Sequence, residues 1–233
     1  MVFVPGGSCE WWSFHEQLTH FSRNRRCLSL NLRGHGESDK PQQEYTMAGY
    51  ADDVAWVIDQ LGLDRPIVVG HSMGGAIALQ LAAEHPDVAR AIVLVDPAPV
   101  TDNRAGFEHM LAAIAKHGAE STRRRLFKNF FLDGYDEALL EEICRRAAQT
   151  PDHVFISEIG DLRIWNGAEA ARKCHVPALH IAAARPACPP AALEDVLPHV
   201  VTGQTVGAGH FNMLEVPEQV NSMIEHFLRQ YVS

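Results

Sequence analysis

Short apolar runs alternate with longer amphipathic segments along most of this chain. The runs are rich in β-branched residues and cover residues 2–4, 27–32, 66–70, 91–96, 178–182 and 204–206. Residues 47–61 repeat apolar positions at helical spacing, and residues 74–84 are small and apolar on nearly every side. This alternation predicts an α/β fold, with a mostly parallel sheet covered by helices on both faces.

One long stretch breaks the alternation. Residues 101–172 carry helical patterns at 104–117, 121–131, 136–149 and 152–172, and no convincing strand. A crossover between parallel strands needs only one helix, so we expect an inserted helical cap. The predicted domains are a core formed by residues 1–100 and 173–233, and a lid formed by residues 101–172.

The strongest chemical signal is the sequence Gly-His-Ser-Met-Gly around Ser72. A Gly-x-Ser-x-Gly pattern alone is weak, but here an apolar strand runs into it and a small-residue helix leaves it. That setting is typical of a nucleophile elbow, in which a tight turn holds the serine hydroxyl above the sheet. The simpler interpretation is a serine that caps a helix. We favour Ser72 as a nucleophile.

A serine nucleophile needs a base to take its proton, and His210 is the best placed of the 13 histidines. It lies in a glycine-rich loop after the last apolar run and before the final helix. Six of the other histidines fall within helical patterns, and His71 lies inside the elbow itself. We therefore expect His210 to be the base.

Together these segments resemble the α/β-hydrolase superfamily over essentially the whole chain. The matching pieces are Val-Pro-Gly-Gly at 4–7, Leu-Arg-Gly-His-Gly-Glu-Ser at 32–38, the serine elbow at 70–75, Val-Asp-Pro-Ala-Pro at 95–99 and Gly-Ala-Gly-His-Phe at 207–211. The resemblance implies an α/β-hydrolase fold and the chain order nucleophile, acid, histidine. Serine at the elbow argues against the haloalkane dehalogenase and epoxide hydrolase branches, which use aspartate there.

The acid is where the sequence departs from most of that superfamily. The loop after the strand that follows the lid, residues 183–190, contains no carboxylate. Some branches place the acid after the earlier strand that follows the nucleophile helix, and Asp96 ends that strand here. We expect Asp96 to orient His210. Glu194, Asp195 or a dyad without an acid are the alternatives, and Asp96 could instead form only a turn.

The resemblance also implies an oxyanion hole and a substrate pocket. The backbone N–H groups of Met73 and Gly7 are the expected oxyanion donors, although Gly7 could serve only a tight turn. Candidate pocket residues are aromatic or apolar, although a helical aromatic is more often part of the core: Trp11, Trp12, Trp165, Phe107, Met110, Phe130 and Phe131. The loop containing Arg33 and His35 is expected to be structural.

Composition narrows the remaining possibilities. The net charge is −9 and the one dense basic run is residues 123–125, so no nucleic-acid partner is expected. Five cysteines without paired spacing indicate reduced thiols and a cytoplasmic location, and no metal or cofactor is expected.

No apolar run is long enough to span a membrane, and no signal peptide is expected. Because the superfamily usually begins with a strand hairpin, a start at Met1 indicates a natural short form or a trimmed chain. The oligomeric state is open.

The expected function is that of a serine hydrolase (carboxylesterase-like). It would cleave a small or medium apolar carboxylic ester or lactone through an acyl-enzyme on Ser72. One alternative is a cofactor-free dioxygenase or lyase that uses His210 as base on the same scaffold. Another is a module that binds a small molecule without converting it.

Overall fold

The computed structural model describes residues 1–101 and 104–232 of the chain. Its centre is one six-stranded sheet in which every neighbouring pair of strands is parallel. The strand order is β2-β1-β3-β4-β5-β6. The strands are β1 (Val2–Val4), β2 (Leu28–Ser29), β3 (Ile67–His71), β4 (Ala91–Val95), β5 (Ala178–Ala182) and β6 (Val201–Gln204). The predicted fold class is confirmed.

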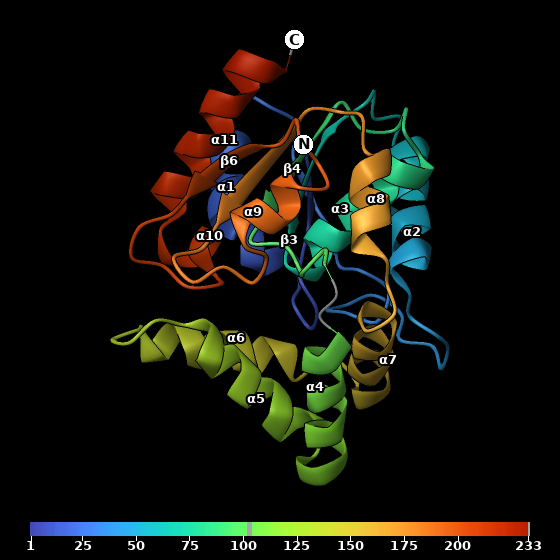
Figure 1. Cartoon of the computed structure of the whole chain (residues 1–233), viewed down its shortest axis with the longest axis vertical. Coiled ribbons are helices and arrows are strands. Elements are labelled where there is room, and N and C mark those ends of the chain that lie inside the picture. The colour runs from blue at the N-terminus through green and yellow to red at the C-terminus, as the bar shows by residue number, and fades with distance from the viewer. Residues whose placement is uncertain (102–103, 233) are drawn as a thin grey trace.

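Helices cover both faces of this sheet (Figure 1). One face carries α2 (Met47–Gln60), α3 (Met73–Glu84) and α8 (Gly167–Lys173), and the other carries α1 (His15–Phe21) and α11 (Pro217–Tyr231). Successive strand residues point to opposite faces. In β4, Ile92 and Leu94 accordingly join the core under α3, whereas Val93 and Val95 join the core under α11. The inner strands β1 and β4 are buried on both faces, which explains why they read as continuous apolar runs, whereas the edge strands β2 and β6 are only partly buried.

The remaining short helices lie in the connections of this core. They are the 3-10 helix η1 (Trp11–Phe14), α9 (Pro190–Glu194) and α10 (Asn212–Glu215). None of the helices among the described residues is long and apolar enough to cross a membrane.

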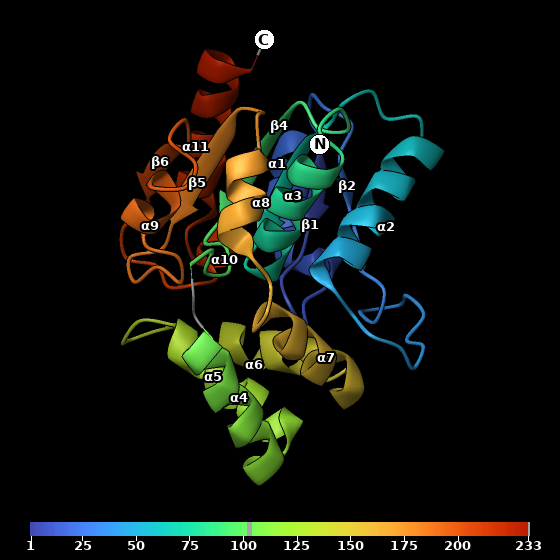
Figure 2. The ribbon, with the colours of Figure 1, turned by 45° about the vertical axis from the view of Figure 1, so that its right-hand side comes forward.

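Four helices between β4 and β5 stand apart from the sheet, at the edge where its strands end (Figures 1 and 2). They are α4 (Arg104–His117), α5 (Ala119–Phe130), α6 (Glu137–Ala147) and α7 (Asp152–Leu162). We call α4 to α7 the lid. The fifth helix of this stretch, α8, packs against α3 and lies beside the sheet in both views.

Two predicted elements were wrong in detail. The segment 152–172 is not one helix, because α7 ends at Leu162 and Asn166 starts α8 by accepting a hydrogen bond from Glu169 N–H at 3.1 Å. The last strand lies at Val201–Gln204 and not at 204–206. The side chain of Val206 is exposed, while Val201 pairs with Leu179 and packs on the core.

Candidate active site

Ser72 lies at a sharp turn between β3 and α3, with backbone angles φ 53° and ψ −117°. Such a positive φ is strained for a residue other than glycine. The turn also needs glycine on either side of the serine. A Cβ on Gly70 would come within 2.0 Å of Gly74 O, and a Cβ on Gly74 would come within 2.0 Å of Val4 O. The geometry is therefore that of the predicted elbow.

His210 and Asp96 form a buried hydrogen-bonded pair. His210 Nδ1 donates to Asp96 Oδ2 at 2.5 Å, and the two side chains are 4% and 0% exposed. With Nδ1 as the donor, Nε2 of the neutral ring keeps its lone pair for a proton. Glu194 and Asp195, the alternative acids, are exposed on and just after α9.

The position of Asp96 is fixed from several sides. Its backbone has φ 39°, and its N–H donates to Ile181 O at 2.9 Å. Oδ1 accepts from Ala183 N–H at 3.0 Å and from Ala187 N–H at 3.4 Å. The loop after β5 therefore contributes no carboxylate of its own but holds Asp96 in place through its backbone. These backbone hydrogen bonds explain how Asp96, which follows β4, is positioned to bond His210.

The loop that carries His210 is packed against the lid. His210 N–H donates to Phe130 O at 2.9 Å, and the centroids of the two rings lie 4.2 Å apart. A Cβ on Gly209 would approach Phe130 O to 2.2 Å. The close approach between lid and histidine loop thus requires glycine at position 209.

His71, next to the elbow serine, is hydrogen-bonded to the loop that carries His210. Its Nε2 donates to the backbone carbonyl of His210 at 2.9 Å, and the two rings lie 4.6 Å apart. Burial, together with the neighbouring His210, lowers the pKa of His71 well below its ordinary value. His71 is therefore held as a neutral donor.

The first turn of the chain lies beside the elbow. A Cβ on Gly6 would meet His71 Nδ1 at 3.0 Å and Ser72 Cβ at 3.1 Å. Ser8 has φ 56° and donates its backbone N–H to His35 Nε2 at 3.0 Å. The buried His35 thus supports this turn, as expected for a structural loop.

Core and lid together line a cavity of about 290 Å³. Its polar end is formed by the turn with Gly6 and Gly7, by Ser72 and Met73 of the elbow, and by His210. Its lid wall is mostly apolar and comprises Phe107, Met110, Leu126, Phe127, Phe130, Phe155, Ile159 and Leu162. The structure therefore brings Ser72, His210, Met73 and Gly7 to one cavity, with Asp96 behind His210.

The three predicted pocket tryptophans do not line this cavity. Trp11 is 41% exposed. Trp12 stacks on His15 and lies under the guanidinium of Arg146. Trp165 donates its indole N–H to Gln80 Oε1 at 2.7 Å, because the chain turns back toward α3 before α8. Phe131, a further expected lining residue, packs on Tyr135 and Phe211 and lies outside the cavity wall.

Glu158 of α7 is a carboxyl-bearing residue of the cavity wall that was not among the residues predicted from the sequence. Burial raises the pKa of its carboxyl, although His35, Tyr50 and Arg123 oppose the shift. A glutamate at the buried position of an amphipathic helix was the available signal, because such a position normally carries an apolar residue.

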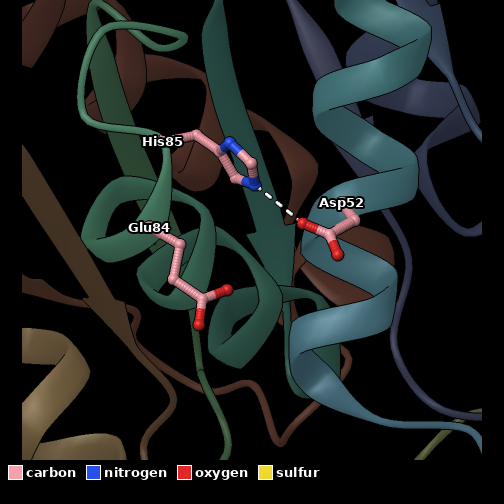
Figure 3. Close-up of side chains that lie close together, drawn as sticks. All are labelled: Asp52, Glu84 and His85. Carbon is pink, nitrogen blue, oxygen red and sulfur yellow. Dashed lines mark hydrogen bonds and ion pairs between the residues drawn. The ribbon is translucent and has the colours of Figure 1, made fainter.

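One group of side chains in the described ranges has metal-ligand spacing: Asp52, Glu84 and His85 (Figure 3). His85 Nε2 lies 2.8 Å from Asp52 Oδ1, and both carboxylates are exposed. His85 follows the C-terminal end of α3, whereas Ser72 precedes its N-terminal end. This group is therefore separated from the cavity by the length of a helix.

The fold and the site define a class. A parallel sheet with serine at a strand-to-helix elbow, and a histidine–aspartate pair at the same sheet edge, is the architecture of nucleophile-elbow α/β proteins. Residues 1–134, more than half of the chain, match the family model described as alpha/beta hydrolase fold. The chain belongs to this family, so the family expected from the sequence motifs is confirmed.

Known proteins with similar sequences and folds agree with this assignment. The chain is 34% identical over 105 residues to 2-(acetamidomethylene)succinate hydrolase of Mesorhizobium japonicum. The match covers 45% of this chain and 38% of that enzyme, so the chain spans less than two thirds of this relative.

Solved structures match nearly the whole chain. The esterase from Thermogutta terrifontis has a TM-score of 0.87 at 20% identity, over 100% of this chain and 90% of that chain. The enol-lactonase from Burkholderia xenovorans LB400 has a TM-score of 0.87 at 22% identity, over 98% and 91% of the two chains. At identities of 20% and 22%, these matches show that the folds are similar and carry no conclusion about activity.

Proposed function

We propose that this protein is a serine hydrolase that cleaves a small or medium apolar carboxylic ester or lactone. The observation that carries the proposal is the buried His210–Asp96 pair beside the strained Ser72, at one end of a mostly apolar cavity. The names of the similar proteins, which include a hydrolase, an esterase and an enol-lactonase, support the same class of chemistry.

In the proposed reaction, Ser72 Oγ attacks the carbonyl carbon of the ester while His210 Nε2 takes the hydroxyl proton. Asp96 holds the Nδ1–H tautomer and stabilises the imidazolium that forms. The backbone N–H groups of Met73 and Gly7 donate to the oxyanion. The carbon–oxygen bond to the leaving alcohol then breaks, and the alcohol takes the proton from His210.

The second half of the proposed reaction frees the enzyme. A water molecule gives a proton to His210 and attacks the acyl-enzyme, and Ser72 leaves with that proton. The released product is the carboxylic acid. All of these steps use groups of this chain and water, and the partner is a small-molecule substrate.

The cavity also bears on the substrate class. Its volume of about 290 Å³ lies near the lower end of the range for ligand sites, and its lid wall is rich in phenylalanine. No arginine or lysine is among the described lining residues. These features favour a compact apolar acyl group over a long chain or an anionic substrate.

The proposal is tested with a fluorophosphonate, a reagent that phosphonylates activated serines. We expect the parent to gain the mass of one phosphonyl group at Ser72, and the adduct to be absent in Ser72→Ala. His210→Gln should slow labelling by about a thousandfold, because it removes the base. A folded parent that stays unlabelled would contradict the proposal and favour proton abstraction by His210 or binding without turnover.

A further inference from the structure

Glu158 is an unusual residue for the wall of an apolar cavity. It lies on α7, its side chain is 1% exposed, and its neighbours in the wall include Phe155, Ile159 and Leu162. A buried polar group without a partner destabilises the fold, and so it needs a physical reason.

One of the two carboxyl oxygens is hydrogen-bonded to the core. Tyr50 O–H donates to Glu158 Oε1 at 2.6 Å, and His35 Nε2 lies 3.2 Å from the same oxygen. His35 Nε2 already accepts the N–H of Ser8, and His35 Nδ1 donates to Arg33 O at 3.1 Å. The hydrogen bond from Tyr50 therefore holds Oε1, whereas His35 Nε2, which accepts from Ser8, is only a neighbour of that oxygen.

The other oxygen, Oε2, is buried and has no hydrogen-bond partner among the described residues. It faces the turn that forms the polar end of the cavity. A Cβ built on Gly7 would lie 3.6 Å from Glu158 Oε2 and 3.6 Å from Met73 Sδ. The free oxygen is therefore close to the two residues proposed to hold the oxyanion.

The geometry points to Glu158 as a substrate-recognition residue that hydrogen-bonds, through Oε2, a hydroxyl group on the acyl part of the substrate near the scissile carbonyl. This inference rests on the proposed function for the identity of that carbonyl. The substrate class is thereby narrowed to esters or lactones of hydroxy acids with a short apolar chain.

A hydroxyl group fits this position better than other polar groups. It can both donate and accept, so it pairs with Oε2 whether the carboxyl is ionised or protonated. Burial raises the pKa of Glu158, which favours the protonated carboxyl relative to an exposed glutamate, and a hydroxyl suits either form. An ammonium group would pair only with the ionised form, and an anion would face a carboxyl without a lysine or arginine in the described wall.

The test uses two phenyl esters of nearly equal shape, phenyl 3-hydroxybutanoate and phenyl 3-methylbutanoate, in which a methyl group replaces the hydroxyl. Binding is measured by titration calorimetry with the Ser72→Ala variant, so it does not depend on turnover. We expect the hydroxy ester to bind at least about tenfold more tightly, because the methyl ester leaves Oε2 buried and unpaired. Equal binding, or tighter binding of the methyl ester, would overturn the inference.

Variants of Glu158 in the same Ser72→Ala background assign the preference to this side chain. Glu158→Met is similar in length and apolar, and it should bind the methyl ester more tightly. Glu158→Gln retains an amide that can bond the hydroxyl and should keep part of the preference. Glu141→Gln, an exposed change on lid helix α6, is the matched control and should behave as Ser72→Ala alone. A hydroxyl preference that survives in folded Glu158→Met would overturn the inference.

The outcomes separate the inference from the proposed function. A hydroxyl preference in binding, in a parent that hydrolyses no ester, would refute the serine hydrolase and keep the recognition role of Glu158. Hydrolysis of both esters by the parent, with no binding preference, would refute only the role of Glu158. The comparison in Ser72→Ala decides the question even if Glu158→Met does not fold.

Discussion

At the scale of single residues, Asp96 is the least obvious member of the site. It follows β4, whereas the loop after β5 supplies only backbone donors to its carboxylate. The consequence is a histidine whose tautomer depends on one buried carboxylate.

We predict that Asp96→Asn lowers kcat for ester hydrolysis by about a thousandfold or more, because an amide that donates to Nδ1 favours the wrong tautomer of His210. Asparagine tolerates the positive φ at this position, so the variant should fold. Glu194→Gln and Asp195→Asn, exposed carboxylates on or after α9, should keep the parent rate in the same assay. A rate loss in either of these variants, and not in Asp96→Asn, would assign the acid elsewhere.

His71 gives a prediction about stability. Its pKa is lowered in the folded protein by burial, so between that value and about 6.5 the unfolded chain binds more protons than the native state. The contribution of His71 to stability is therefore present above pH 6.5 and is lost as the pH falls through this window.

The expected measurement compares urea unfolding of the parent and of His71→Gln at pH 7.5 and pH 5. The glutamine amide can take over the hydrogen bond to His210 O without titrating. The parent should lose more unfolding free energy on acidification than the variant, by up to about 1.4 kcal/mol per pH unit. Identical losses would mean that His71 does not titrate in this way.

At the scale of elements, the site depends on the contact between lid helix α5 and the histidine loop. The backbone carbonyl of Phe130, at the end of α5, accepts the N–H of His210. This contact leaves no space for a side chain at Gly209.

Gly209→Ala should therefore destabilise the protein by about 1–3 kcal/mol and lower esterase activity, because the added methyl forces α5 and the histidine loop apart. Gly160→Ala is the matched control. Gly160 lies inside α7 with nothing within 4 Å of its would-be Cβ, so alanine there should leave activity unchanged and add up to about 1 kcal/mol of stability. Thermal unfolding and initial rates of both variants provide the check, and a neutral Gly209→Ala would contradict the close contact.

The elements that the sequence predicted well are those with a strong local signal. Strands such as Ala91–Val95 are buried along their whole length and read as unbroken apolar runs, and Asp96 follows this strand directly. Ser72 likewise follows the buried strand β3, whereas His210 was predicted from its glycine-rich loop before the final helix. The break between α7 and α8 was missed because the helical pattern continues through it. Its cause is a side-chain cap at Asn166 and the turn of Trp165 toward Gln80, which is distant in sequence.

The cavity wall could not be predicted from the sequence for the same reason. The tryptophans Trp11, Trp12 and Trp165 have the size and chemistry of pocket residues, but their positions depend on partners elsewhere in the chain. The environment of Glu158 is likewise formed by Tyr50 and His35, more than 100 positions away. Local patterns carry no information on such contacts.

At the scale of the whole molecule, the sheet core supplies the polar end of the cavity and the lid supplies most of its apolar wall. Polar contacts also join the two parts. Arg146 of α6 forms an ion pair with Glu10 at 2.5 Å, and Met47 N–H of α2 donates to Asp161 Oδ2 of α7 at 2.7 Å. These contacts hold the lid helices against the core.

The most direct test of the account is the hydrolysis of p-nitrophenyl esters, from acetate to longer acyl chains, by the parent and by Ser72→Ala. If Ser72 is the nucleophile, the parent should hydrolyse these esters with an optimum among short to medium chains that suits a cavity of about 290 Å³, and Ser72→Ala should lose at least about a thousandfold in rate. A folded parent without esterase activity, or equal rates in both proteins, would contradict the central claim that Ser72 is the nucleophile of an ester hydrolase.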